Sequence, residues 1–282
     1  MSEVETTSSF TPAQIFEKVI ISGINKVNLR FVPMLLLSIL AGMYIAFGSV
    51  FSTVIGTGLL GVAPYGVTKL LMGLVFSLGL ILVIVGGAEL FTGNMLMVAA
   101  YASKKIKAVS VAQNWVVVFI GNFIGSLLLA GLILSARAYL LANGEIGKTM
   151  LSIANSKMQY SFSQAFSLAI LCNILVCLAV WLAFSARNTA DKILSIVFPI
   201  TAFITAGFEH SVANMYLIPV TLLLKQFDPV YVASTGIDVS VLGWSEFFIN
   251  NLLPVTLGNM VGGIVFVGLA YFLIYRPVGK SG

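Results

Sequence analysis

The segment GFEHSVANM, residues 207–215, contains the side chains best suited to proton or anion chemistry in this chain. Glu209 and His210 are adjacent there, and His210 is the only histidine among 282 residues. An imidazole is neutral or cationic near neutral pH, so it can meet an anion and give or take a proton. A lone histidine is more often a satisfied core residue, but an ionisable group within an apolar membrane segment is a functional candidate. We therefore predict a functional role for His210.

The pattern around this pair occurs twice. GAELFTGNM (87–95) and GFEHSVANM (207–215) share G-x-E-x-x-x-x-N-M, and GNFIGS (121–126) and GNMVGG (258–263) share G-N-x-x-G in the same order. Two matches in matching order indicate an internal repeat. Glu89 corresponds to Glu209, whereas Leu90 corresponds to His210, so the repeat itself does not require an imidazole.

The elements that carry these motifs are expected to be membrane helices. The chain is 59% hydrophobic and 9% charged, with a mean hydropathy of +1.04, far from the composition of soluble domains. Four apolar segments fit one crossing each: 31–60, 108–136, 158–186 and 247–275. Two more, 70–103 and 193–224, are interrupted by Glu89 and by Glu209–His210. Each is too long for one perpendicular helix and too short for two with a loop.

The sequence therefore predicts an all-α integral membrane protein with six transmembrane helices and broken second and fifth helices. Three crossings in each half invert the second half relative to the first, and substrate sites form where such broken helices meet. We expect Glu89 and Glu209 to support the helix breaks by accepting hydrogen bonds from freed backbone N–H groups. Gly87 and Gly207 suit the sharp turns.

Charge predicts the orientation in the membrane. With both termini in the cytoplasm, ten Lys and Arg residues lie on that side and five on the other, as positively charged cytoplasmic loops require. The net charge of +5 is then a topology signal, and no nucleic-acid-binding surface is expected. Residues 1–30 form a predicted cytoplasmic amphipathic helix, capped by Thr11 with Pro12 at its first position. Residues 31–276 form one channel domain, and residues 277–282 form a cytoplasmic tail.

Catalysis has no support in the motifs. Cys172 and Cys177 are five residues apart and lie on different helix faces, which favours buried free thiols. The chain has no second histidine, no zinc-binding pattern beside His210 and no G-x-S-x-G motif, so we expect no enzyme, metal or cofactor. A neutral-solute channel of the aquaglyceroporin type is an alternative, but the chain has no N-P-A pair and gives His210 no task there.

The segments GAELFTGN, GFEHSVANM, CNILVCLAVWLAFSAR and PVTLGNMVGG resemble the formate/nitrite transporter family, from about residue 12 to residue 276, and are closest to its formate channel branch. The resemblance implies an aquaporin-like fold and a homopentamer in the lipid of the bacterial inner membrane. Each protomer would have a pore for small monovalent anions or their acids. Formate is the expected substrate, with nitrite and hydrosulfide as alternatives. The segment SKMQYSF lacks the adjacent histidines of many formate channels, so it does not assign the substrate.

The resemblance also implies residue roles. Phe76 and Leu80 correspond to a cytoplasmic slit, Leu90 to the loop at the break, and Val176 and Phe203 to the opposite slit. His210 corresponds to a central histidine, Thr92 to its hydroxyl partner, and Lys157 to a lysine at the outer vestibule that raises the local anion concentration. Asn173 and Asn214 correspond to polar pore or loop-support positions. We expect the anion to be protonated near His210 and to cross largely as the neutral acid, with direct passage of the anion as the competing mechanism.

Overall fold

The computed structural model describes residues 9–276, and every regular element within them is helical. The predicted tail, 277–282, lies outside the described residues, as do residues 1–8. In the first half the helices are α1 (Pro12–Val27), α2 (Phe31–Gly56), α3 (Tyr65–Gly86), η1 (Gly93–Leu96), α4 (Met97–Ala102), α5 (Ala108–Ser135), η2 (Ala138–Leu140) and η3 (Ala142–Gly144). In the second half they are α6 (Glu145–Met158), α7 (Phe162–Ser185), α8 (Thr189–Thr205), α9 (Ser211–Leu217), α10 (Pro219–Phe227), α11 (Pro229–Ser234), α12 (Trp244–Glu246), η4 (Phe247–Leu252), α13 (Leu253–Gly263), η5 (Ile264–Leu269) and α14 (Ala270–Tyr275).

These helices make six crossings of one bundle, which confirms the predicted fold class. Helices α2, α5 and α7 and the run α12–α14 are each long and apolar enough to cross a membrane, and so is α3. The fifth crossing consists of two shorter parts, α8 and α9–α10, separated at residues 206–210. The second crossing is likewise divided into α3 and η1–α4, on either side of residues 87–92. Both interruptions lie where the sequence predicts them.

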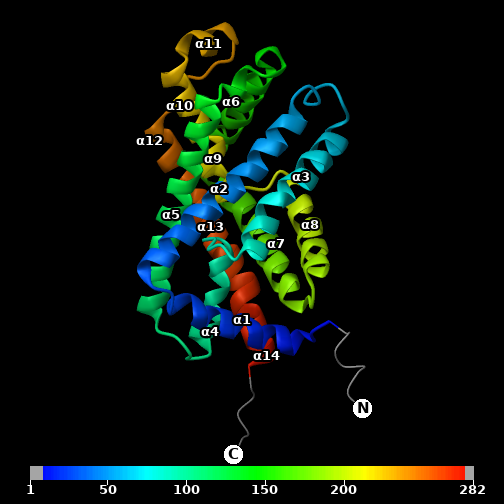
Figure 1. The fold of residues 1–282 in the computed structure, drawn as a ribbon, viewed down its shortest axis with the longest axis vertical. Helices are drawn as coiled ribbons and strands as arrows, with labels where there is room; N and C mark the ends of the chain where they lie inside the picture. Colours follow the sequence, from blue (N-terminus) through cyan, green and yellow to red (C-terminus); the bar gives the residue numbers. More distant parts are fainter. Residues whose placement is uncertain (1–8, 277–282) are drawn as a thin grey trace, which may run out of the picture.

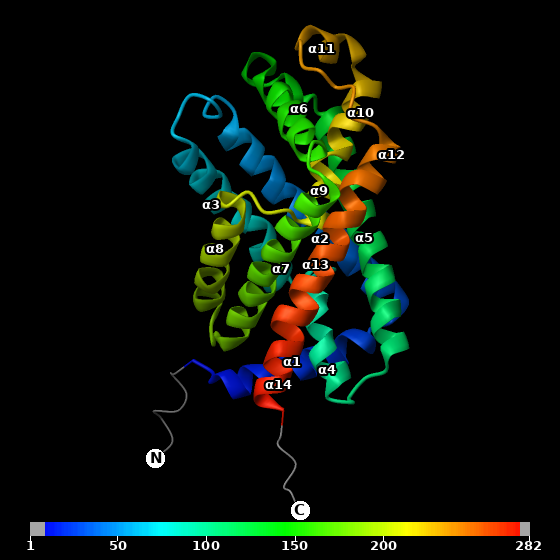
Figure 2. The same cartoon turned by 180° about the vertical axis from the view of Figure 1, so that it is seen from behind.

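The inverted arrangement is visible in the ribbon. In Figure 1, α3 comes down from the upper end and α4 continues below the break, whereas α8 rises from the lower end and α9 and α10 continue above. Helices α1, α4 and α14 lie at one end of the bundle, and α6, α10 and α11 lie at the other (Figures 1 and 2). The first and last described segments are therefore on the same side.

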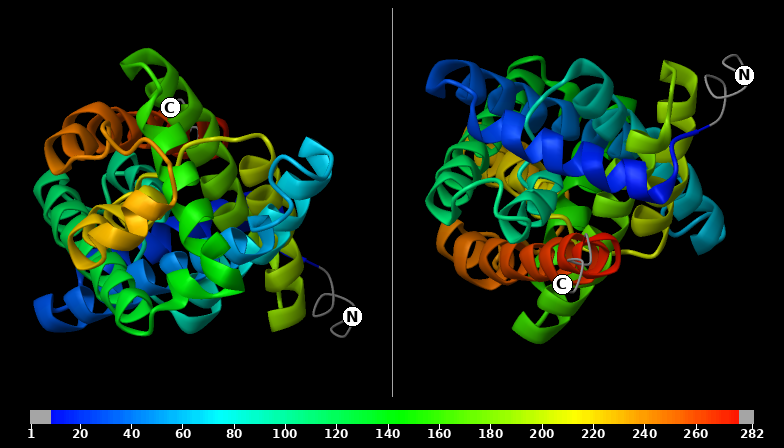
Figure 3. Two further views of the ribbon diagram at one scale, coloured as in Figure 1. Left: turned by 90° about the horizontal axis from the view of Figure 1, so that it is seen from above. Right: turned by 90° about the horizontal axis from the view of Figure 1, so that it is seen from below.

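Helix α1 lies across one end of the bundle rather than along it (Figure 3, right). Thr11 is its N-cap, with Pro12 in the first turn, and Thr11 and Gln14 form a capping box. The predicted helix start is therefore confirmed. The apolar face of α1 packs against the bundle, and its residues Ile15, Phe16, Val19 and Gly23 are buried. This packing anchors α1 to the rest of the protein.

The glycines of the G-N-x-x-G motifs bring helices into contact within the protomer. A Cβ atom at Gly125 would collide with the carbonyl oxygen of Ile39 in α2, and one at Gly262 would collide with that of Ile170 in α7. Close approach of this kind is the usual packing of membrane helices. The motif thus joins α5 to α2 and α13 to α7, the symmetry-related pairs that support the two breaks.

Candidate functional site

The two helix breaks have the same local geometry. Gly87 and Gly207 follow α3 and α8 with φ values of 75° and 73°, a left-handed conformation that glycine adopts without the penalty of a Cβ atom. After each glycine the chain turns back, and the N–H of Ala88 donates to Val83 O (2.9 Å) as that of Phe208 donates to Phe203 O (3.0 Å). One carbonyl in the last turn of each half-helix, that of Val83 and that of Phe203, is thereby satisfied.

Each break carries a buried glutamate that is held by a lysine and an asparagine. Lys157 Nζ donates to Glu209 Oε1 at 2.6 Å, and Asn214 Nδ2 donates to Oε2 at 2.7 Å. In the first half, Lys26 Nζ and Asn94 Nδ2 donate to Glu89 at 2.6 and 2.8 Å.

The sequence analysis predicted backbone N–H groups as the hydrogen-bond donors to these two glutamates, and that prediction was wrong. Among the described residues, the donors to these carboxylates are the lysine and asparagine side chains and not the backbone N–H groups of the breaks.

Asparagines of the G-N-x-x-G motifs hold the backbone of the breaks instead. Asn122 Oδ1 accepts from Phe91 N at 2.9 Å, and its Nδ2 donates to the carbonyl of Glu89. Asn259 does the same for Ser211 N, at 2.8 Å, and for the carbonyl of Glu209. Each amide therefore satisfies backbone groups that have no water available in a membrane.

A further asparagine pair was missed by sequence reasoning. Asn114 Oδ1 accepts from Asn94, and Asn251 Oδ1 accepts from Asn214, each at 2.8 Å. Both lie eight residues before the asparagine of the G-N-x-x-G motif, which places each pair on one face of a helix. The repeated N-x₇-N spacing was the signal that could have revealed them.

Thr92 and His210 join the two breaks. Thr92 Oγ1 lies 2.8 Å from His210 Nε2, although 118 residues separate them. His210 is also the N-cap of α9, where its Nδ1 accepts the N–H of Ala213 at 3.1 Å. Because Nδ1 is an acceptor there, the proton of the neutral ring is on Nε2, and Nε2–H donates to the threonine hydroxyl. The hydrogen of that hydroxyl is then available for a further hydrogen bond.

The predicted constriction residues meet around His210. One small cavity, of about 10 Å³, is lined by Ile45, Phe76, Leu80, Leu90, Val176, Ile200, Phe203 and His210. That volume is close to the minimum that holds one water molecule. Sequence reasoning missed Ile45 and Ile200, since apolar residues of membrane helices carry no mark of facing a pore.

The grouping of the constrictions differs from the expectation. The rings of Phe76 and Phe203 contact each other edge to face, with centroids 5.6 Å apart. These two residues were expected in opposite slits, but they form one layer because α3 and α8 pack side by side. Leu80 and Leu90 lie at the other boundary, since both also line the larger cavity described next.

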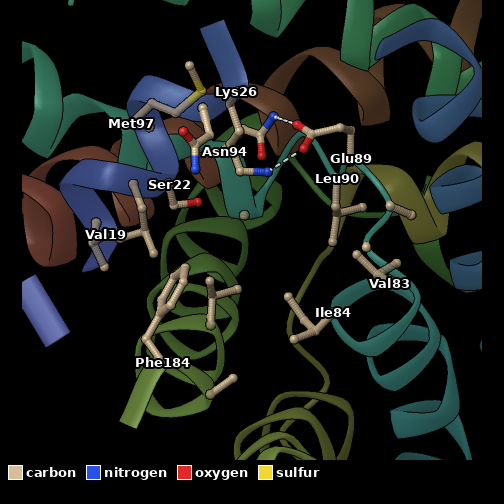
Figure 4. A pocket seen from close by; sticks show the side chains of 18 of the residues that line it. Val19, Ser22, Lys26, Val83, Ile84, Glu89, Leu90, Asn94, Met97 and Phe184 are labelled. Carbon is tan, nitrogen blue, oxygen red and sulfur yellow. Dashed lines mark hydrogen bonds and ion pairs between the residues drawn. The ribbon is translucent and has the colours of Figure 1, made fainter. Parts of the chain in front are cut away.

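A vestibule of about 570 Å³ opens toward the end of the bundle that α1 covers. Figure 4 shows Lys26, Glu89 and Asn94 joined at its inner wall, with Leu90 beside them and Val19 and Ser22 of α1 opposite. Lys18 and Lys192 also line it. Burial lowers the pKa of Lys18, and the nearby positive charges of Arg187 and Lys192 lower it further. The vestibule is thus electropositive.

Of the five predicted pathway residues, His210 is the one that lines either of the two described cavities. The side chain of Lys157 is 17% exposed and ion-paired with Glu209 rather than a free charge at the mouth. Asn173 and Asn214 line neither cavity described above. Both are buried and hold loop atoms, which supports their loop-support alternative. Among the described residues no cluster of His, Cys, Asp or Glu could hold a metal ion.

Two broken membrane helices that meet at a polar pair define a helical membrane protein of the transporter class. The chain belongs to the formate/nitrite transporter family, whose sequence profile matches residues 13–273. The formate channel FocA of Escherichia coli K12 is 41% identical over 258 residues, which cover 90% of each chain.

Further relatives agree with this assignment. A probable formate transporter of Methanothermobacter thermautotrophicus is 39% identical over 86% of this chain and 88% of its own. The solved structure described as a pentameric formate channel with formate bound has a TM-score of 0.81 and 46% identity, and the match covers 87% of this chain and 97% of that one.

Proposed function

We propose that this protein is a channel or proton-linked transporter for small monovalent anions of weak acids, formate foremost, with one pore in each protomer. The observation that carries the proposal is His210, which lines a small apolar cavity among the predicted constriction residues and is bonded to Thr92 behind it. Relatives at about 40% identity are named formate channels, and a similar solved structure has formate bound.

The geometry suits a weak acid. The lysines of the vestibule raise the local concentration of anions. A bare carboxylate cannot enter the apolar constrictions without a large desolvation cost. His210 lines the central cavity and is the group that can exchange a proton with a carboxylate there, while the Thr92 hydroxyl is its partner at Nε2. A small acid that accepts a proton there can cross the apolar layers as a neutral molecule.

The resting state of His210 constrains that exchange. Its Nδ1 accepts the Ala213 N–H, so the imidazolium can form only if this N-cap hydrogen bond is released. We infer that protonation of His210 and the start of α9 are coupled, and that the neutral ring is the resting form. Transport of the anion itself remains the competing mechanism.

The assembly and orientation are proposed on similar grounds. The similar solved structure is described as pentameric, and we propose a homopentamer for this chain. The lysine-rich connection 103–107 and the α7–α8 connection lie at the same end as α1. We propose that this end faces the cytoplasm of a bacterial inner membrane, with both termini inside, since short cytoplasmic loops collect positive charge.

The test is an uptake panel in proteoliposomes. Formate, nitrite, hydrosulfide and glycerol are offered separately, and current is recorded beside flux. We expect formate to enter faster than glycerol. If the neutral acid crosses, fewer than one elementary charge should move for each formate that enters. Equal entry of glycerol and formate would refute the anion pathway. A ratio of one at every pH would refute protonation within the pore.

A further inference from the structure

Two donors from one helix converge on the carbonyl oxygen of Thr92. Asn173 Nδ2 donates to Thr92 O at 3.2 Å, and Cys177 Sγ donates to the same oxygen at 3.5 Å. Asn173 and Cys177 are four residues apart in α7, so they lie on one face in successive turns. Both are completely buried. The carbonyl therefore accepts one amide and one thiol hydrogen bond.

The orientation of the Asn173 amide is determined by its surroundings. Its Nδ2 also donates to Asn259 O at 2.7 Å, so both amide hydrogens are engaged, whereas Oδ1 is buried without a partner among the described residues. The opposite orientation would place Oδ1 against two carbonyl oxygens. Asn173 thus links the first break, at Thr92, to the residue that holds the backbone of the second break, Asn259.

Within residues 9–276, this link exists in one half of the repeat only. Lys26 and Lys157, which hold equivalent glutamates, are 131 residues apart. The same offset places Gly42 at the position of Asn173, because 173 − 131 = 42. A Cβ atom at Gly42 would collide with the Asn122 backbone, so no side chain fits there. The two halves of the repeat therefore differ in how the helix breaks are held where they meet. Thr92 and His210, which lie at these breaks, also differ from their counterparts in the other half.

We propose that Asn173 and Cys177 are positioning residues, which fix the Thr92 carbonyl and thereby hold the Thr92 hydroxyl at His210 Nε2. The carbonyl, Cα and side chain of Thr92 are covalently joined, so a displacement of the carbonyl moves the hydroxyl. The hydroxyl has 2.8 Å to span to the ring, and a shift of about 0.5 Å takes it out of good hydrogen-bond geometry. The inference deepens the proposed function, because it assigns the control of the central pair.

The single histidine makes a direct test possible. Protein labelled with ¹⁵N only in histidine and purified without a histidine tag gives two ring resonances, both from His210. Solid-state NMR of the assembled protein in lipid reports the tautomer and the hydrogen bond at Nε2, independently of transport. Thr92→Val defines the resonance of Nε2 without a hydroxyl partner. Formate flux at several pH values is measured on the same preparations.

The variants are chosen in matched pairs. Cys177→Ala removes the thiol donor, and Cys177→Ser replaces it with a stronger donor. Cys172→Ala is the control, since Cys172 is an equally buried free thiol in α7. Asn173→Leu removes both amide donors at similar volume.

We expect Cys177→Ala to shift the Nε2 resonance part of the way toward that of Thr92→Val and to lower flux about two- to threefold, as a weak hydrogen bond implies. Cys177→Ser should restore both, Cys172→Ala should change neither, and Asn173→Leu should give the larger shift. If Cys177→Ala and Asn173→Leu assemble with an unchanged Nε2 resonance, or if Cys172→Ala shifts it equally, the positioning role is wrong. If the resonances move as expected in a protein that passes no formate, the proposed function fails and the positioning role stands.

Discussion

The Lys157–Glu209 ion pair allows a quantitative prediction. The two charged atoms are 2.6 Å apart, and the side chains of Lys157 and Glu209 are only 17% and 2% exposed. Lys157→Met keeps much of the apolar stem and removes the charge, so Glu209 is left buried with the Asn214 amide as its remaining side-chain partner. The loss should therefore appear as instability of the break rather than as weaker attraction of anions from solution.

The magnitude follows from the distance and the burial. At 2.6 Å two unit charges attract by about 6 kcal/mol if the effective dielectric constant is about 20. Desolvation offsets part of this attraction, and removing one partner of a buried pair costs about 3–5 kcal/mol. We expect Lys157→Met to lower the free energy of unfolding by this amount. Lys157→Met combined with Glu209→Gln should recover more than half, because no uncompensated charge remains.

Lys148 provides the control within the same helix. Its ammonium is also 2.6 Å from a carboxylate, that of Glu145, but the two side chains are 42% and 53% exposed. An exposed pair contributes about 0–1 kcal/mol, so Lys148→Met should change the free energy of unfolding by no more than this.

Equilibrium unfolding in mixed detergent micelles, followed by tryptophan fluorescence, measures each variant. Equal losses for Lys157→Met and Lys148→Met would refute the reasoning. So would a loss for Lys157→Met that disappears in high salt, because buried pairs are screened little.

Three other outcomes are expected. His210→Asn should keep the N-cap of α9, since asparagine is a good N-cap. Formate flux should nevertheless lose its dependence on pH between about 5 and about 8, because an amide does not titrate there. If the flux of this variant kept the pH profile of the wild type, a proton-exchange role for His210 would be contradicted. Gly125→Ala should sharply reduce the yield of assembled protein in size-exclusion chromatography, since its Cβ would collide with α2, whereas Gly131→Ala, which meets open space, should not. The hydrogen bond from the Tyr231 backbone N–H, and to a smaller extent that from the Tyr139 hydroxyl, lowers the pKa of Asp228. The carboxylate therefore stabilises the fold above its unfolded-state pKa, and this contribution is lost as the pH falls through the folded-state pKa. In thermal unfolding, the stability difference between wild type and Asp228→Asn should shrink from about pH 6 to about pH 3; a constant difference would show that the fold does not stabilise the carboxylate.

The sequence by itself determined the number of crossings, the places of both breaks and the repeat. These features depend on local free energies. Each apolar segment partitions into the membrane according to its own composition, and a charged residue at the centre of such a segment raises the free energy of insertion by about 2.5–3.5 kcal/mol. The glycines at 87 and 207 and the cap at Thr11 are equally local, because the backbone conformation that they support involves neighbouring residues. The functional interest of His210 followed from the same contrast between an ionisable side chain and an apolar segment.

Only the tertiary structure decided which side chains meet. Lys157 reaches Glu209 across 52 residues and Thr92 reaches His210 across 118, and Phe76 packs on Phe203 rather than in an opposite slit. Such pairings depend on which face each helix turns toward its neighbour. In a chain with little charge every face is apolar, so hydropathy does not mark the inner one. The close contacts of α2 with α5 and of α7 with α13 fix these faces, and buried polar groups then take the partners that the packing brings within reach, because an unpaired polar group is costly away from water.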